Sequence, residues 1–170
     1  IKNGYLGLHI DTTCVNPTQP TLSLENTIIE NMGAAGILAQ GSWVEAKNCV
    51  IGNCSQYAVV LNIGGKYDFK HCTIGNYWSY STRVTPSLVL NNWYEAAGNL
   101  IIPRPLTKAY FGNCIIYGNI EEEILRDSLA GFAFNYQFDH CLLRTKISTA
   151  SPSRFINCLV NSEPDFNDVS

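Results

Sequence analysis

A short signature recurs six times along this chain of 170 residues. Each copy has Asn or His, then Cys or Thr, then any residue, and then Ile, Leu or Val. The copies begin at Asn26, Asn48, His71, Asn113, His140 and Asn157. The first three copies lie about 22 residues apart, and a period of that size is typical of a solenoid built from stacked repeats. The signature therefore predicts a repetitive fold and leaves the activity open.

The residues around the signature form columns when the copies are aligned. The position two residues before the Asn or His is apolar: Leu24, Ala46, Phe69, Phe111, Phe138 and Phe155. The position three residues after it is aliphatic: Ile29, Ile51, Ile74, Ile116, Leu143 and Val160. Apolar positions alternate before the Asn and resume after it in shifted phase, which predicts two short strands joined by a bend. Asn suits such a bend because it tolerates the left-handed backbone conformation.

A third short strand is expected in each repeat, at 6–11, 36–40, 58–62 and 87–91. Three strands in about 22 residues make one coil, and successive coils stack at the strand spacing of about 4.8 Å. The sequence therefore predicts an all-β fold, a three-sided parallel β-helix of about six coils. It forms a single domain over residues 1–170.

One long insertion interrupts the period. The interval from His71 to Asn113 exceeds one coil by about 20 residues, and the excess falls in 77–86 and 92–106. Loops that project from one face of a solenoid are common binding sites. The insertion is therefore the first place to look for a ligand.

The segment 119–131 carries the pattern of a short helix. Four apolar residues share one helical face: Ile120, Ile124, Leu125 and Leu129. Asn119 can cap the first turn, the acidic run 121–123 suits that turn, and Gly131 can end the helix. One short helix is expected there, on the outside of the coil.

Composition restricts the possible partners. The net charge is −3, and charged residues make up only 15% of the chain. No basic face is expected, so the sequence predicts no nucleic-acid partner. No apolar run reaches the ~18 residues that a membrane span requires. The chain begins at Ile1 in the middle of a repeat, so we expect it to be a piece of a longer protein.

The turns and strands resemble those of a known class of proteins. The Asn-(Cys/Thr)-x-Ile-x-Asn turns and the strand 36–39 resemble right-handed parallel β-helix proteins of the pectate-lyase-like superfamily. The segments 113–119 and 163–166 resemble, more narrowly, secreted bacterial β-helix repeat proteins. The resemblance covers essentially the whole chain. It implies a right-handed coil and a location outside the cytoplasm, secreted or at the cell surface, and it says little about a reaction.

The cysteines and two of the histidines are expected to be structural. Five of the seven cysteines form one column: Cys49, Cys72, Cys114, Cys141 and Cys158. Parallel Cβ vectors disfavour disulfides between stacked coils, so these thiols should fill small buried slots. His71 and His140 take the ladder position of Asn. Cys14 and Cys54 lie outside the column and stay unassigned. No metal and no cofactor is expected.

The outer face of the third strand holds the active site in many pectate-lyase-like enzymes. Its expected outward rows are His9, Leu38, Val60 and Val89, and then Asp11, Gln40, Asn62 and Asn91. The weak catalytic candidates are His9 with Asp11, and Asp11 paired with Glu95. The enzymes of this class use several convergent acidic groups or a positioned base, whereas amides dominate the second row. No catalytic residue is assigned on this pattern.

Aromatic residues of the insertion give the best indication of a ligand. Sugar rings stack on indole and phenol rings, while amides and guanidinium groups bind their hydroxyls. The candidate carbohydrate-binding residues are Trp78, Tyr80, Trp93, Tyr94, Arg83, Arg104, Gln40, Asn62 and Asn91. The alternative is that the insertion folds back and buries its rings over the outward aliphatic row.

Three functions remain open from the sequence. The first is an extracellular or cell-surface module that binds polysaccharide without chemistry, or serves as a rigid scaffold in a surface assembly. The second is a polysaccharide lyase or glycoside hydrolase whose catalytic groups lie partly outside this segment. The third is a purely structural stalk. The expected partner is accordingly a polysaccharide or a surface-assembly protein.

Overall fold

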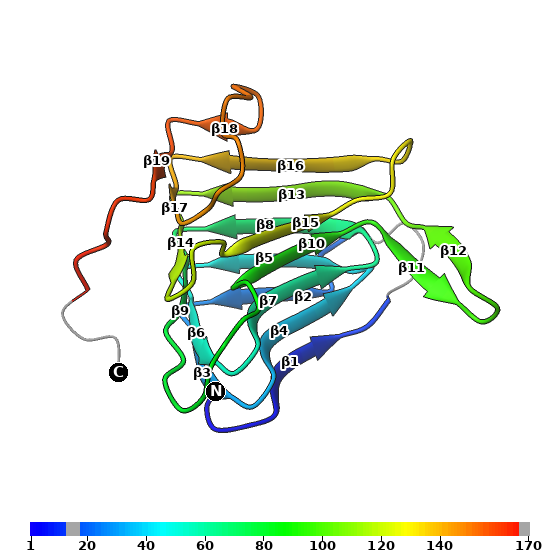
Figure 1. The fold of residues 1–170 in the computed structure, drawn as a ribbon. Coiled ribbons are helices and arrows are strands. Elements are labelled where there is room, and N and C mark those ends of the chain that lie inside the picture. The colour runs from blue at the N-terminus through cyan, green and yellow to red at the C-terminus, as the bar shows by residue number, and fades with distance from the viewer. Residues whose placement is uncertain (13–17, 167–170) are drawn as a thin grey trace.

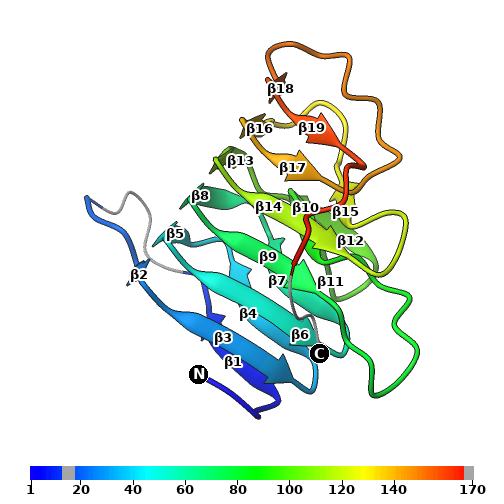
Figure 2. The ribbon, with the colours of Figure 1, turned by 90° about the vertical axis from the view of Figure 1, so that its left-hand side faces the viewer.

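The fold consists of short strands arranged in three parallel sheets. The computed structural model describes residues 1–12 and 18–166, and these contain strands and turns but no helix. Each of the first four repeats contributes a strand to each sheet in turn, and we number the sheets by that order. Figures 1 and 2 show the resulting stack from two sides.

Sheet 1 collects the strands that precede the signature. They are β2 (Leu22–Glu25), β5 (Trp43–Lys47), β8 (Gly65–Lys70), β13 (Leu106–Gly112), β16 (Phe134–Asp139) and β18 (Phe155–Ile156). Sheet 2 collects those that follow it. They are β3 (Ile28–Met32), β6 (Val50–Cys54), β9 (Thr73–Asn76), β14 (Ile115–Gly118), β17 (Leu142–Leu143) and β19 (Leu159–Val160).

Sheet 3 collects the expected third strands and one more. It consists of β1 (Leu6–Ile10), β4 (Ala35–Gln40), β7 (Tyr57–Asn62), β10 (Leu88–Asn91) and β15 (Ile124–Asp127). Every pairing within the three sheets is parallel. This path is consistent with a three-sided parallel β-helix, as the sequence predicts.

The bend between sheets 1 and 2 is left-handed in every repeat. All six Asn or His residues that open the signature have φ between 48° and 53°. Asn48 Nδ2 donates to Asn26 Oδ1 at 2.7 Å, and Asn157 Nδ2 lies 3.1 Å from His140 Nε2. The predicted role of this residue at a bend is confirmed, because short polar side chains adopt the conformation at low cost.

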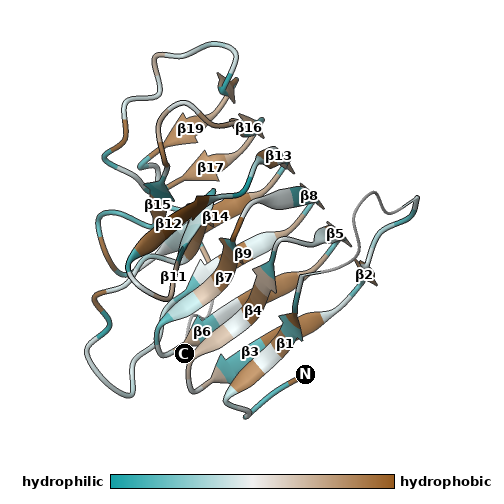
Figure 3. Ribbon diagram, turned by 90° about the vertical axis from the view of Figure 1, so that its right-hand side faces the viewer, coloured by the Kyte–Doolittle hydropathy of each residue, from teal (hydrophilic) through white to brown (hydrophobic). Residues whose placement is uncertain are grey.

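The apolar columns stack inside the coil as the repeat predicts. Rings of Phe69, Phe111, Phe138 and Phe155 lie nearly parallel, with successive centroids 5.3, 5.1 and 5.4 Å apart. In the aliphatic column of sheet 2, Ile29, Ile51, Ile74 and Ile116 have no exposed surface. Figure 3 shows hydrophobic and hydrophilic bands along strands such as β3 and β6, which is the alternation expected of a wall with one inner face.

The cysteine column is reduced and largely buried. Cys49, Cys72, Cys114 and Cys141 are buried, and Cys158 is half-buried. Their thiols donate to nearby carbonyl oxygens, as Cys49 Sγ does to Lys47 O. Cys54 is also buried and free, and burial raises its pKa to about 11. Cys14 lies outside the described residues.

Alkylation of the native protein should separate these thiols. At pH 8 a thiol with a pKa of about 11 is ionised in about one molecule in a thousand. We expect iodoacetamide to modify Cys158 before Cys54, and peptide mass spectrometry measures the order. The same reaction in urea, where both thiols are exposed, is the control. Equal labelling of Cys54 and Cys158 in the native protein would contradict the burial.

The long insertion divides into a loop and a hairpin. Residues 77–87 form a loop, and β11 (Trp93–Ala96) pairs antiparallel with β12 (Leu100–Pro103). The hairpin projects beside sheet 3 in Figure 1. The hairpin, residues 93–103, therefore stands away from the stack, and the chain returns to the stack at β13.

The prediction of a helix at 119–131 is wrong. Ile124–Asp127 form β15, which pairs in parallel with β10, and the residues on both sides of β15 are turns or irregular. Glu123, which suited the first turn of a helix, is completely buried against Arg83. This ion pair and the open edge of β10 outweigh the local helical pattern, because tertiary contacts override weak propensities.

Candidate functional site

The outer face of sheet 3 has the predicted rows. His9 pairs with Leu38, and the row continues through Val60 and Val89 to Leu125. Val60 and Val89 are only 6% and 8% exposed. This row is therefore an apolar strip, and the histidine stands at one end of it.

The weak catalytic candidates lie on different elements. His9 Nε2 is 3.2 Å from Gln40 Oε1, and Asp11 Oδ1 accepts the N–H of Thr12 at 2.7 Å. Glu95 is exposed on β11. Since β1 is three strands from β10, roughly 14 Å separates His9 from the strand that leads into the hairpin. The structure places no second carboxylate in hydrogen-bond contact with Asp11 within the described residues.

A small polar cluster lies at the β15 end of the second outward row, where Asn91 pairs with Asp127. Asn91 Nδ2 donates to Asp127 Oδ2 at 2.9 Å, and Trp93 Nε1 donates to Asp127 Oδ1 at 3.1 Å. Asn91 Oδ1 accepts the backbone N–H of Trp93 at 3.1 Å. The sequence reasoning missed Asp127, because it assigned that residue to a helix.

The other aromatic candidates lie in separate places. Trp78 and Tyr80 make an edge contact, with centroids 5.0 Å apart, and line a hollow of about 190 Å³ with Glu30 and Asn53 of sheet 2. Tyr94 belongs to the hairpin, where the Arg104 guanidinium lies 5.3 Å from its ring centre. The structure thus splits the predicted carbohydrate-binding set, and only Trp93 joins the amide row of sheet 3.

Arg83 lies in the interior. Its Nη2 is 2.6 Å from Glu123 Oε1 and 2.8 Å from Asn76 O, and the side chain has no exposed surface. A further bond joins Nη2 to Asn119 Oδ1 at 2.6 Å. Both terminal nitrogens of Arg83 are therefore used inside the fold, and the residue holds the insertion to the coil.

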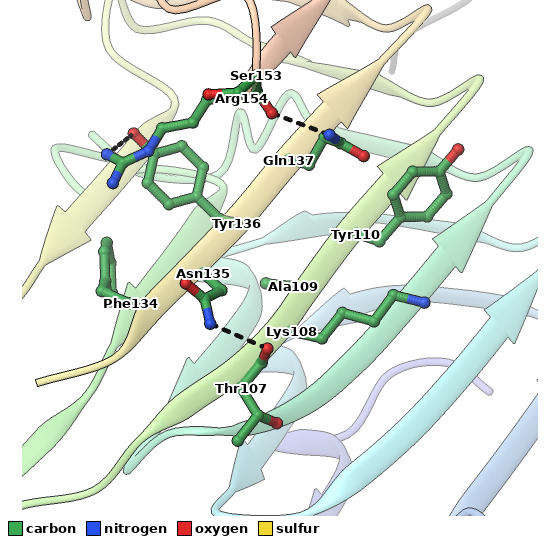
Figure 4. A pocket seen from close by; sticks show the side chains of 10 residues that line it. All are labelled: Thr107, Lys108, Ala109, Tyr110, Phe134, Asn135, Tyr136, Gln137, Ser153 and Arg154. Carbon is green, nitrogen blue, oxygen red and sulfur yellow. Dashed lines mark hydrogen bonds between the residues drawn. The ribbon is translucent and has the colours of Figure 1, made fainter.

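A hollow lies on the outer face of sheet 1. It encloses about 310 Å³ between β13, β16 and the turn before β18. Side chains of Lys108, Tyr110, Asn135, Gln137 and Arg154 surround it (Figure 4). Asn135 Nδ2 donates to Thr107 O at 3.3 Å, and Gln137 Nε2 donates to Ser153 O at 2.9 Å. We call this site the sheet 1 groove.

Charged groups hold the walls of the sheet 1 groove. Asp68 accepts a hydrogen bond from Lys108 and forms an ion pair with Lys70, at 3.1 Å. Tyr110 Oη donates to Asp139 Oδ2 at 2.9 Å, and this bond to the carboxylate raises the pKa of Tyr110 to about 12. The phenol and His140 together lower the pKa of Asp139. Tyr110 therefore stays a neutral, fixed ring over the physiological pH range.

The sequence pattern contains a signal for this groove. Lys108, Tyr110 and Gln137 occupy outward positions of sheet 1, which the alternation around the signature assigns to solvent. The same face carries Trp43, whose ring lies 3.4 Å from Lys66 Nζ.

Within residues 1–12 and 18–166, no three His, Cys, Asp or Glu side chains come together as metal ligands. The same residues contain no helix that is long and apolar enough to span a membrane. Comparison with family models, with characterised proteins and with solved structures finds no match.

Proposed function

We propose that this chain is an extracytoplasmic module that binds polysaccharide in the sheet 1 groove without catalysing a reaction. The coil would be right-handed, as in the pectate-lyase-like proteins that its turns resemble. The observation that supports the proposal is the groove itself, a hollow on the outer face of sheet 1 that is lined by polar and aromatic side chains. Its volume of about 310 Å³ suits one or two sugar rings of a longer chain.

The side chains of the groove have the chemistry that a sugar requires. Asn135 and Gln137 offer amide groups for hydroxyls, and Tyr110 offers a ring edge. Lys108 and Arg154 add positive charge at opposite ends of the hollow. These cations favour an acidic polysaccharide over a neutral one, because charge complementarity strengthens the encounter. The groove runs along rigid strands, so a ligand would meet a preformed surface.

The arrangement of the other candidates supports binding over catalysis. Hydrolysis of a glycosidic bond generally needs two carboxyl groups at a defined separation. Asp127 is held by Asn91 and Trp93, whereas Glu95 stands on the exposed part of the hairpin. Asp139 beside the groove is held by Tyr110 and His140. Asp127 and Asp139 thus both have structural partners.

A binding assay tests the proposal directly. We expect Lys108→Gln combined with Tyr110→Ala to weaken binding to acidic polysaccharides by about tenfold or more. Affinity electrophoresis against polyuronates, sulfated glycans and neutral glucans measures the effect. Chain length is followed by size-exclusion chromatography in the same samples, so that cleavage would be seen.

The matched controls are Lys146→Gln and Trp78→Ala. Lys146 is an exposed lysine that pairs with Glu121, and Trp78 lies beside sheet 2. Both controls should bind as the unmodified protein does. Shortened chains would make the protein an enzyme. Absence of binding to every glycan would reject the proposal and favour a rigid scaffold.

A further inference from the structure

Sheet 3 stops before the other two sheets do. Sheets 1 and 2 continue from β13 and β14 through β16 and β17 to β18 and β19, while β15 is the last strand of sheet 3. The residues 144–154, which connect β17 to β18, form no strand. Figure 1 shows β15 with no strand beyond it in that wall. A free edge of this kind is a template for another extended segment.

The backbone of β15 presents its unused groups to that edge. Leu88 N donates to Glu123 O at 2.9 Å. The backbone N–H and C=O groups of successive strand residues point to alternate sides, so those of Leu125 point toward β10. The backbone groups of Ile124 and Arg126 point away from β10, toward the free edge. Glu122 Oε1 accepts the N–H of Ile124 at 3.1 Å. The N–H and C=O of Arg126 are therefore the groups that an added strand would bond.

The same edge carries two arginines without an acidic partner. Arg126 Nη1 and Arg154 Nη1 both donate to the phenolic oxygen of Tyr136, the second at 3.0 Å. Arg126 Nε is buried and has no hydrogen-bond acceptor. Neither arginine forms an ion pair with any carboxylate of the described residues. Two like charges beside one neutral oxygen repel each other, and an anion between them would relieve this.

We propose that an extended acidic peptide segment adds to sheet 3 along β15 and places one carboxylate against Arg126 and Arg154. Backbone bonds to Arg126 would supply the register, and the carboxylate would supply the selectivity. This mode of recognition extends a sheet at an exposed edge and reads alternate side chains in pockets. The expected partner is thus a protein segment, and its site lies at the edge of β15, next to the sheet 1 groove, with which it shares Arg154.

Stacking defines the sequence that such a segment should have. Within sheet 3 the inner row ends at Leu88 and Ile124, and the outer apolar row ends at Val89 and Leu125. An added strand should therefore offer an aliphatic residue over each of these rows. The next inner position lies over Arg126 and should be Asp or Glu. The position over Asp127 should be Asn, which can continue the hydrogen bond that Asn91 makes.

A pair of labelled peptides tests the proposal. The probe is fluorescein-labelled Ser-Val-Leu-Asp-Asn-Gly, and its control has Asn in place of Asp. We expect the Asp peptide to bind about tenfold or more tightly than its Asn control in fluorescence anisotropy. The Arg154→Gln variant should abolish that difference. Arg154 is exposed, so the variant should fold even if Arg126→Gln does not.

Two further measurements separate strand addition from simple attraction to charge. Hydrogen exchange should show protection of the Arg126 amide when the Asp peptide is bound. Lys108→Gln, which changes the sheet 1 groove, should leave peptide binding unchanged and so keeps this proposal independent of glycan binding. The proposal is overturned if the Asp peptide does not bind at about 1 mM. It is overturned equally if sulfate alone displaces the peptide and the Arg126 amide is never protected.

Discussion

Replacing Ile74 by Asp is expected to unfold the whole stack. Ile74 has no exposed surface and lies between Ile51 and Ile116 in the aliphatic column of sheet 2. The substitution loses about 1.5–3 kcal/mol of apolar burial and leaves a carboxylate without a partner, at a cost of several kcal/mol more. The free energy of unfolding of a domain is about 5–15 kcal/mol, so the lost burial and the buried carboxylate together remove most or all of it. Urea unfolding followed by circular dichroism measures the loss.

Val50→Asp provides the matched control for this experiment. Val50 is the first residue of β6 and is 44% exposed, so the same carboxylate there remains in water. Its effect on the free energy of unfolding should stay within about 0.5 kcal/mol. Ile74→Val removes a single methyl group and should cost about 0.5–1.5 kcal/mol. If Ile74→Asp and Val50→Asp unfold at the same urea concentration, the column does not support the fold.

The features that the sequence predicted correctly are those that repeat. A left-handed bend at Asn26 or His71 is visible because the same residue type returns at the same place in each coil. The Phe column and the third strands follow from the same register, since like residues stack on like residues in a parallel sheet. Because the signature occurs in six copies, one irregular residue does not hide the repeat.

The features that were missed depend on contacts made once. The apolar spacing of Ile120, Ile124 and Leu125 fits a helix as well as a strand with turns, and local pattern cannot separate the two when the run is short. The deciding contact joins Glu123 to Arg83, forty residues earlier in the chain. Nothing in the sequence identifies that pair, because both residue types are usually exposed.

In the candidate site, too, the repeated features were predicted correctly and the features that occur once were missed. The alternation around the signature defined the outward rows of sheet 3, and the structure has those rows. The path of the insertion was not encoded in any repeat, so the four aromatic residues proposed there as carbohydrate-binding could not be placed relative to one another. The structure divides them between the hollow beside sheet 2, lined by Trp78, and the hairpin that begins at Trp93.

Replacing Glu123 by Ala is expected to be the most damaging removal of a polar group in the described residues. Glu123 Oε1 and Oε2 lie 2.6 and 2.9 Å from the two terminal nitrogens of Arg83. The same carboxylate accepts the Ser87 N–H at 2.9 Å and the Ile120 N–H at 3.0 Å. Gly118 leaves the space for this pair, because a Cβ there would overlap both side chains. One carboxylate thus ties the loop, β10 and β15 together.

The expected cost of Glu123→Ala is about 3–5 kcal/mol, because Arg83 would keep a buried charge without a partner. A double variant, Arg83→Met with Glu123→Leu, removes the stranded charge and should be more stable than Glu123→Ala alone. Urea unfolding of the two variants measures the difference. Glu121→Ala, which breaks only an exposed pair with Lys146, should leave unfolding almost unchanged. A double variant less stable than Glu123→Ala would show that the guanidinium's bonds to backbone oxygens, and not its charge pairing, hold the insertion in place.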